Sequence, residues 1–132
     1  MSVRDWFRRE PSQFVTDANQ EANMSRQLAL APTTLAELRK LGVDSNRLLR
    51  LEYFFYTNAE SKAQALAGDL RQLGYDSSVG PSAHDKRIIL VTGWSAPVSM
   101  SEQHVSDWTR EMCQFAAKHD CEFDGWGTTP AQ

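Results

Sequence analysis

Apolar positions recur at helical spacing in the first third of the chain. Between residues 12 and 30 a loose pattern of this kind predicts a helix. Pro32 is expected to break that helix, because proline lacks a backbone N–H and clashes with the preceding turn. Thr34 and Glu37 then have the spacing of a capping box, which predicts a second, short helix over 34–41.

From Leu48 the apolar period changes to two, which predicts a β-strand. The residues expected on one face of this strand are Leu49, Leu51, Tyr53 and Phe55. Those expected on the other face are Leu48, Arg50, Glu52, Phe54 and Tyr56. Because both sets contain apolar residues, both faces of the strand are expected to need cover.

Two helical stripes and three further strands follow. The first stripe consists of Ala59, Ala63, Leu66, Leu70 and Leu73, with Asn58 as its expected N-cap. A short strand over 75–79, a loop over 80–86 and a central strand over 87–94 come next. The second stripe consists of Val105, Trp108, Met112, Phe115 and Ala116, in a helix that begins with the capping-box pair Ser99 and Glu102 and ends near His119. A last strand is predicted over 121–126.

The order from Leu48 onward is therefore β-α-β-β-α-β. With right-handed crossovers this order predicts an α+β, ferredoxin-like sandwich, in which both helices cover one face of a four-stranded antiparallel sheet. Residues 1–33 are expected to add an N-terminal helical extension to a domain over 34–129. The second face of the sheet, with Phe54 and Tyr56, must then meet the N-terminal helices or a partner.

Composition describes one domain of ordinary make-up. The chain has 132 residues, 41% hydrophobic and 23% charged. A domain of this length buries roughly two thirds of its unfolded surface, so it needs neither a disulfide nor a metal to fold. Cys113 and Cys121 fit packed thiols of a reducing compartment, and charges between residues 4 and 9 stand where a signal peptide would be apolar. We therefore expect a cytoplasmic protein with no cofactor and no membrane association.

Charge is spread unevenly along the chain. The net charge of the whole is −3, and it divides into +2 for residues 1–50 and −5 for residues 51–132. Much of the acidic excess lies between Ser101 and Asp124. A basic partner is therefore favoured there over the phosphate backbone of a nucleic acid.

Candidate catalytic groups are sparse. His119, Cys121 and Asp124 are close in sequence, but their spacing matches no strong zinc or nucleophile pattern, and no G-x-S-x-G motif occurs. The simpler interpretation is a histidine at a helix end and a buried cysteine. We therefore expect a protein that is not an enzyme and holds no metal.

Two other classes of binding protein stay open. An RNA-recognition module would stack bases on Phe54 and Tyr56, although residues 86–93 lack the aromatic signature of its third strand. A structural domain whose sheet faces pair into a homo-oligomer is the other alternative. Val3, Trp6 and Phe7 share one helical side near the N-terminus, which favours packing against the domain or a second subunit over membrane binding.

The last predicted strand carries a more specific signal. Residues 122–128 read Glu-Phe-Asp-Gly-Trp-Gly-Thr, which resembles the E-[YF]-D-G-W-G-T ending of the RraB family, protein regulators of ribonuclease E activity. Residues 35–44, the aromatic strand at 51–56 and the segment 70–75 are similar to that family's layout. Better-known members continue into a strongly acidic tail, whereas residues 129–132 here read Thr-Pro-Ala-Gln.

The resemblance implies a ferredoxin-like sandwich without a catalytic site, which binds ribonuclease E or a related endoribonuclease and dampens or redirects its cleavage of RNA. From the residues themselves, the candidates for partner binding are Asp107, Glu111, Glu122, Asp124, Trp126, Phe54 and Tyr56. Trp126 either anchors an interface or seals the end of the core. Gly125 and Gly127 are expected to permit a bulge or tight bend beside it.

Overall fold

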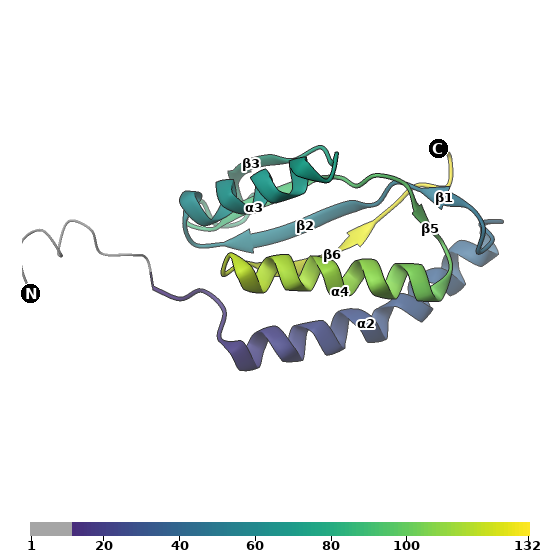
Figure 1. Ribbon diagram of the computed structural model, residues 1–132, viewed down its shortest axis with the longest axis horizontal. Coiled ribbons are helices and arrows are strands. Elements are labelled where there is room, and N and C mark those ends of the chain that lie inside the picture. Colours follow the sequence, from purple (N-terminus) through teal and green to yellow (C-terminus); the bar gives the residue numbers. More distant parts are fainter. Residues whose placement is uncertain (1–11) are drawn as a thin grey trace, which may run out of the picture.

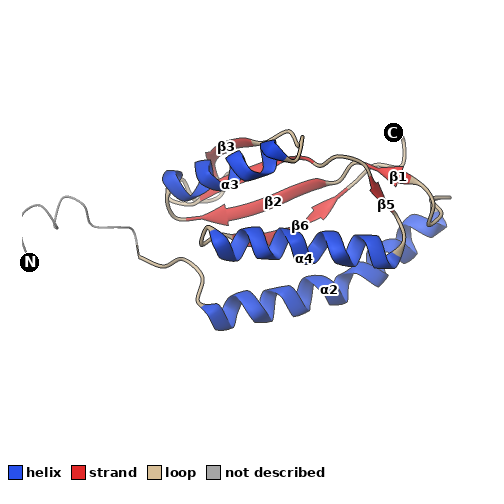
Figure 2. Cartoon of the chain, in the orientation of Figure 1, coloured by secondary structure: helices blue, strands red, loops and turns tan. Residues whose placement is uncertain are grey.

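The computed structural model describes residues 12–132 and has three helices and six strands in this range. The helices are α2 (Asp17–Lys40), α3 (Glu60–Gln72) and α4 (Glu102–Lys118). Four strands, β2 (Glu52–Thr57), β3 (Ser78–Pro81), β4 (Ile89–Trp94) and β6 (Glu122–Gly127), form an antiparallel sheet in the order β3-β4-β2-β6. The short strands β1 (Leu48–Leu49) and β5 (Val98–Ser99) form a second sheet (Figures 1 and 2). The expected α+β class is confirmed.

The core lies between the larger sheet and its helices. The alternation predicted for the first strand is confirmed on its inner side, where Leu49, Leu51, Tyr53 and Phe55 are all 0% exposed. The helical stripes meet them, since Ala63, Leu66 and Leu70 of α3 and Val105, Trp108, Met112 and Ala116 of α4 join the same buried cluster. Arg50 and Leu51 interrupt the predicted strand, so its first two residues pair with β5 and the rest with β4 and β6.

The prediction that Pro32 separates two helices is wrong, because α2 continues through it. Ala31 and Leu35, on either side of the proline, are 1% and 4% exposed and belong to the core cluster. Packing of this face against α4 outweighs the local cost of the proline. Thr34 consequently lies inside the helix and donates its hydroxyl to the Leu30 carbonyl at 3.3 Å instead of capping a helix start. The helix also runs across residues 33 and 34, the expected boundary of the extension.

Instead of covering the face with Phe54 and Tyr56, α2 lies beside α4 and along the outer edge of β6 (Figure 1). Two of its side-chain amides donate to carbonyls of that edge strand or the residue before it: Asn23 Nδ2 to Phe123 O at 2.8 Å and Gln20 Nε2 to Cys121 O at 2.9 Å. These bonds occupy acceptors that an unprotected edge strand would present to another chain. Asn23 is buried for this reason, although its side chain is polar.

Three local expectations need smaller corrections. Asn58 is not a helix cap, because its amide donates to Ser12 O, and Ala59 at the N-cap makes no side-chain capping bond. Ser101 caps α4 in place of Ser99, since the Ser101 hydroxyl accepts the His104 N–H at 3.1 Å. The strand expected over 75–79 is instead β3, so Gly80 and Pro81 pair with β4 and do not form a turn.

Candidate functional site

One face of the larger sheet has no helix against it among residues 12–132. We call it the open face and define it by the outward positions of the strands: Ser78 and Gly80 of β3, Leu90, Thr92 and Trp94 of β4, Glu52, Phe54 and Tyr56 of β2, and Glu122 and Asp124 of β6. Registered partners in adjacent strands point to the same side, and the alternate residues Tyr53 and Phe55 are buried under the helices. Three aromatic rings and three carboxylates therefore share this face.

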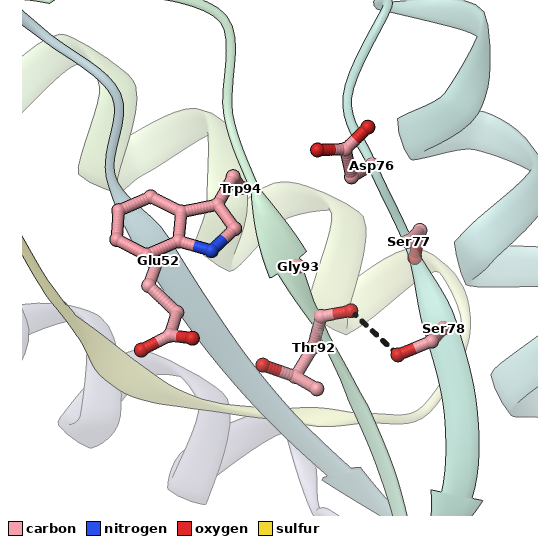
Figure 3. A pocket seen from close by; sticks show the side chains of 7 residues that line it. All are labelled: Glu52, Asp76, Ser77, Ser78, Thr92, Gly93 and Trp94. Atoms are coloured by element: carbon pink, nitrogen blue, oxygen red, sulfur yellow. Dashed lines mark hydrogen bonds between the residues drawn. The ribbon is translucent and has the colours of Figure 1, made fainter.

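A hollow of about 330 Å³ lies at one corner of the open face. Its lining comes from β2, β3 and β4 and the approach to β3: Glu52, Asp76, Ser77, Ser78, Thr92, Gly93 and Trp94 (Figure 3). Glu52 and Trp94 are direct cross-strand partners, so the carboxylate side chain and the indole stand next to each other. Glu52 faces Gly127 on its other side, and that glycine has open space where a side chain would be. The hollow thus combines an aromatic wall with an accessible carboxylate.

Gly93 makes this corner possible. A Cβ built on it would lie 1.8 Å from the backbone oxygen of Asp76, so only glycine lets the 76–78 segment approach β4. That segment is held by three bonds: the Asp76 N–H donates to Trp94 O at 3.0 Å, the Tyr53 hydroxyl donates to Asp76 O, and Arg50 pairs with the Asp76 carboxylate at 2.7 Å. The wall of the hollow opposite Glu52 is therefore held by one backbone hydrogen bond, one side-chain hydrogen bond and one ion pair.

The polar groups of the hollow differ in how they are satisfied. The Asp76 carboxylate is neutralised by Arg50, whereas Glu52 makes no ion pair within the described residues. The Thr92 hydroxyl oxygen is buried and has no hydrogen-bond partner in residues 12–132, although a buried hydroxyl without one is costly. In Figure 3 this hydroxyl points toward the side of Glu52. An unpaired carboxylate and an unpaired hydroxyl together favour a donor-bearing, cationic group.

The open face brings together four of the seven partner-binding candidates from the sequence and leaves Asp107, Glu111 and Trp126 elsewhere. Phe54, Tyr56, Glu122 and Asp124 lie on it, and Tyr56 is the cross-strand partner of Glu122. Asp107 and Glu111 are instead exposed on the outer surface of α4, which covers the opposite side of the sheet. The acidic candidates therefore form two separate surfaces.

Trp126 packs against the helices because β6 contains a bulge. Tyr53 pairs with Trp126 and Phe55 with Phe123, so β6 has one more residue than β2 in this interval. Gly125 supplies the extra residue at φ +105°, a conformation that strongly favours glycine. The bulge turns the Trp126 ring inward, where it meets Trp108 edge-on at 6.4 Å between ring centres. The expected bulge is present at Gly125, whereas Gly127 has no positive φ.

His119 and Cys121, just before β6, make contacts that stabilise the fold and do not form a catalytic or metal site within residues 12–132. His119 Nε2 lies 2.6 Å from the Asp69 carboxylate, and hydrogen bonds from His119 and Lys118 lower the pKa of that carboxyl. Burial raises the pKa of the Cys121 thiol to about 11, so it is protonated at neutral pH and a poor nucleophile. Among residues 12–132 no three His, Cys, Asp or Glu side chains are arranged to hold a metal ion.

Asp120, which the sequence did not mark, anchors the segment before α2. It adopts φ +55° and accepts hydrogen bonds from Phe14 N at 2.7 Å, Val15 N at 2.9 Å and Lys62 Nζ at 2.6 Å. Burial alone would raise the pKa of this carboxyl, but the three donors outweigh that effect and lower it. Val3, Trp6 and Phe7 lie outside the described residues.

Glu52 and Trp94 were also absent from the sequence candidates. The alternation of β2 places Glu52 on the same face as Phe54, so the position of Glu52 on this face could be predicted from the sequence. Its pairing with Trp94 depends on the register between β2 and β4, which are separated in the chain by α3 and β3. No local pattern encodes that register.

The chain matches one family, described as RraB, Regulator of ribonuclease activity B, over residues 32–128. No curated protein gives a significant match. None of the described helices has the length and apolar character needed to cross a bilayer.

Proposed function

This chain belongs to the RraB family, described as regulators of ribonuclease activity, and we propose that it inhibits ribonuclease E-type RNA processing by binding the enzyme. The family match, which covers most of the described chain, is the observation that carries this proposal. In this proposal the protein acts in the cytoplasm as a binding partner and performs no chemistry on RNA.

The chemistry of the open face supports a protein partner over RNA. Phe54, Tyr56 and Trp94 could stack bases, but Glu52, Glu122 and Asp124 stand among them and would repel phosphates. No lysine or arginine occupies an outward strand position of that face. A basic protein segment gains from both the rings and the carboxylates.

We also infer that the larger sheet and its crossover helices form a ferredoxin-like sandwich. The order β3-β4-β2-β6, with α3 between β2 and β3 and α4 between β4 and β6, supports this assignment. In such a sandwich the helices cover one face, so the second face is the natural place for a partner.

The proposal is tested by titrating the protein into full-length ribonuclease E from the same organism, with calorimetry for binding and a fluorescent single-stranded RNA for cleavage. We expect saturable binding to the enzyme, a cleavage rate that falls with the same midpoint, and no heat with the RNA alone. Heat with RNA alone, and slower cleavage by unrelated ribonucleases as well, would instead indicate that the protein shields the substrate.

Charge-reversal variants then identify the surface. Glu122→Lys with Asp124→Lys changes the open face, and Asp107→Lys with Glu111→Lys makes the same change in charge on α4. We expect the first pair to abolish inhibition and the second to preserve it. The reverse result would move the binding surface to α4, and no inhibition by the unaltered protein at any concentration would refute the proposed function.

A further inference from the structure

We propose that the corner hollow of the open face is a receptor for one arginine side chain of an extended basic segment in the protein partner. This inference rests on the proposed function for the identity of the partner, but the hollow itself is defined by the structure. The occupant is a guanidinium group that stacks on the Trp94 indole, pairs with Glu52 and donates to the Thr92 hydroxyl.

The size and walls of the hollow suit such a group. A volume of about 330 Å³ accommodates a single long side chain. Guanidinium groups stack on indole faces and form paired hydrogen bonds with carboxylates, and Trp94 and Glu52 offer these two contacts from adjacent strands. Gly127, on the other side of Glu52, has open space where a side chain would be.

The unpaired Thr92 hydroxyl is an independent indication of a ligand. Its oxygen is buried without a partner in the described residues, whereas a valine of the same shape would avoid the cost of burying it. A guanidinium has five N–H donors, so it can serve this acceptor and the Glu52 carboxylate together. A threonine at this position is thus explained by a hydrogen bond from a bound guanidinium, and not by a contribution to the stability of the free protein.

The neighbouring hollow does not suit a cation. It measures about 360 Å³, shares Trp94 with the first hollow and is otherwise lined by Arg50, Thr129 and Gln132. Its lining contains a guanidinium of its own and no acidic side chain. The negative charge of Glu52 therefore favours the first hollow for a cation. Glu122 and Asp124, which make no ion pair within residues 12–132, extend the negative potential across the same face.

The test uses two blocked pentapeptides, acetyl-Gly-Lys-Arg-Lys-Gly-amide and the same peptide with citrulline in place of arginine. Citrulline keeps the shape of the arginine side chain but is neutral. Binding is followed by NMR through the indole N–H signal of Trp94, assigned with Trp94→Phe. We expect the arginine peptide to shift this signal saturably and the citrulline peptide to bind at least about fivefold more weakly.

Two variants separate ligand contacts from structural roles. Thr92→Val should leave stability equal or higher while weakening the arginine peptide about threefold or more, a combination that a purely structural threonine would not produce. Glu52→Gln should weaken it about fivefold. Glu21→Gln, which removes one exposed carboxylate from α2, is the control for net charge and should bind as the unaltered protein does.

The outcomes also distinguish this inference from the proposed function. Equal binding of both peptides, or binding that ignores Glu52→Gln and Thr92→Val, would overturn the arginine receptor. If the variants lose the peptide yet inhibit ribonuclease E normally, the hollow is not the docking point and the inference fails while the proposed function stands. Peptide binding with no effect of the protein on the ribonuclease would refute the proposed function and leave the receptor in place.

Discussion

Replacing Gly93 with alanine should displace the segment that forms one wall of the hollow. The new Cβ would lie 1.8 Å from the Asp76 oxygen and 2.6 Å from its carbonyl carbon, both inside the 3.0 Å below which something must shift. The neighbour is backbone, so the movement must break the bond from the Asp76 N–H to Trp94 O and the one from the Tyr53 hydroxyl to Asp76 O. Each such bond is worth about 1 kcal/mol, and a buried tyrosine hydroxyl left unpaired costs about 1–3 kcal/mol more. We therefore expect Gly93→Ala to lose about 3–5 kcal/mol of unfolding free energy.

Urea unfolding followed by far-UV circular dichroism measures this loss. Gly80→Ala is the matched control, because Gly80 lies in the adjacent strand and a Cβ there meets nothing within 4 Å. We expect the control to stay within about 0.5 kcal/mol of the unaltered protein. If Gly93→Ala were as stable as Gly80→Ala, the close approach of Asp76 to β4 would be refuted, and the described shape of the hollow with it.

Three further predictions concern the scaffold. Pro32→Ala should raise the unfolding free energy by about 1–3 kcal/mol, because a proline inside a continuous helix is costly; an unchanged urea midpoint would favour a helix that ends before it. Asp120→Asn keeps a residue that tolerates positive φ but replaces the ion pair with Lys62 by a weaker contact. We expect it to lower the free energy of unfolding by about 1–2 kcal/mol at pH 7. The pKa of Asp120 is lowered from its ordinary 3.8, so the difference in unfolding free energy should be complete above pH 3.8 and shrink as the pH falls below it. A difference that stays constant as the pH falls below 3.8 would contradict this. Burial raises the pKa values of the Cys113 and Cys121 thiols to about 11, so both should resist iodoacetamide at pH 8 until urea unfolds the protein. Mass spectrometry measures the labelling, and rapid labelling of the native protein would contradict their burial.

Local patterns in the sequence were sufficient for most of the elements. The stripes of α3 and α4 and the alternation of β2 were predicted with the correct buried faces, because each depends only on the period of one helix or strand. Leu73, at the end of the predicted α3 stripe, is the exception and is 41% exposed. The errors occur where a distant contact outweighs a local signal. Packing of Ala31 and Leu35 carries α2 through Pro32, and pairing with β4 draws Gly80 and Pro81 into β3.

For the candidate site too, local patterns predicted some features and distant contacts decided the others. The sequence placed Phe54 and Tyr56 on one side of β2, and its ending carried the family resemblance that residues 32–128 confirm. The sequence left open whether Trp126 faces a partner or the core. One extra residue in β6 determines this orientation. Strict alternation would have turned the Trp126 ring to the open face with Asp124, whereas the bulge at Gly125 turns it onto Trp108.

By itself the sequence determined most of the elements, most of their inner faces and the family, since these depend on short-range periodicity and on a contiguous motif. Only the tertiary structure decided which side chains meet on the open face. Glu52 and Trp94 are neighbours because β2 and β4 pair in one register. Within residues 12–132 the buried Thr92 hydroxyl has no hydrogen-bond partner. The register between β2 and β4 is set by the packing of the whole core, and the approach of Asp76 to β4 depends on the space that Gly93 leaves. No local segment of the sequence encodes either of these.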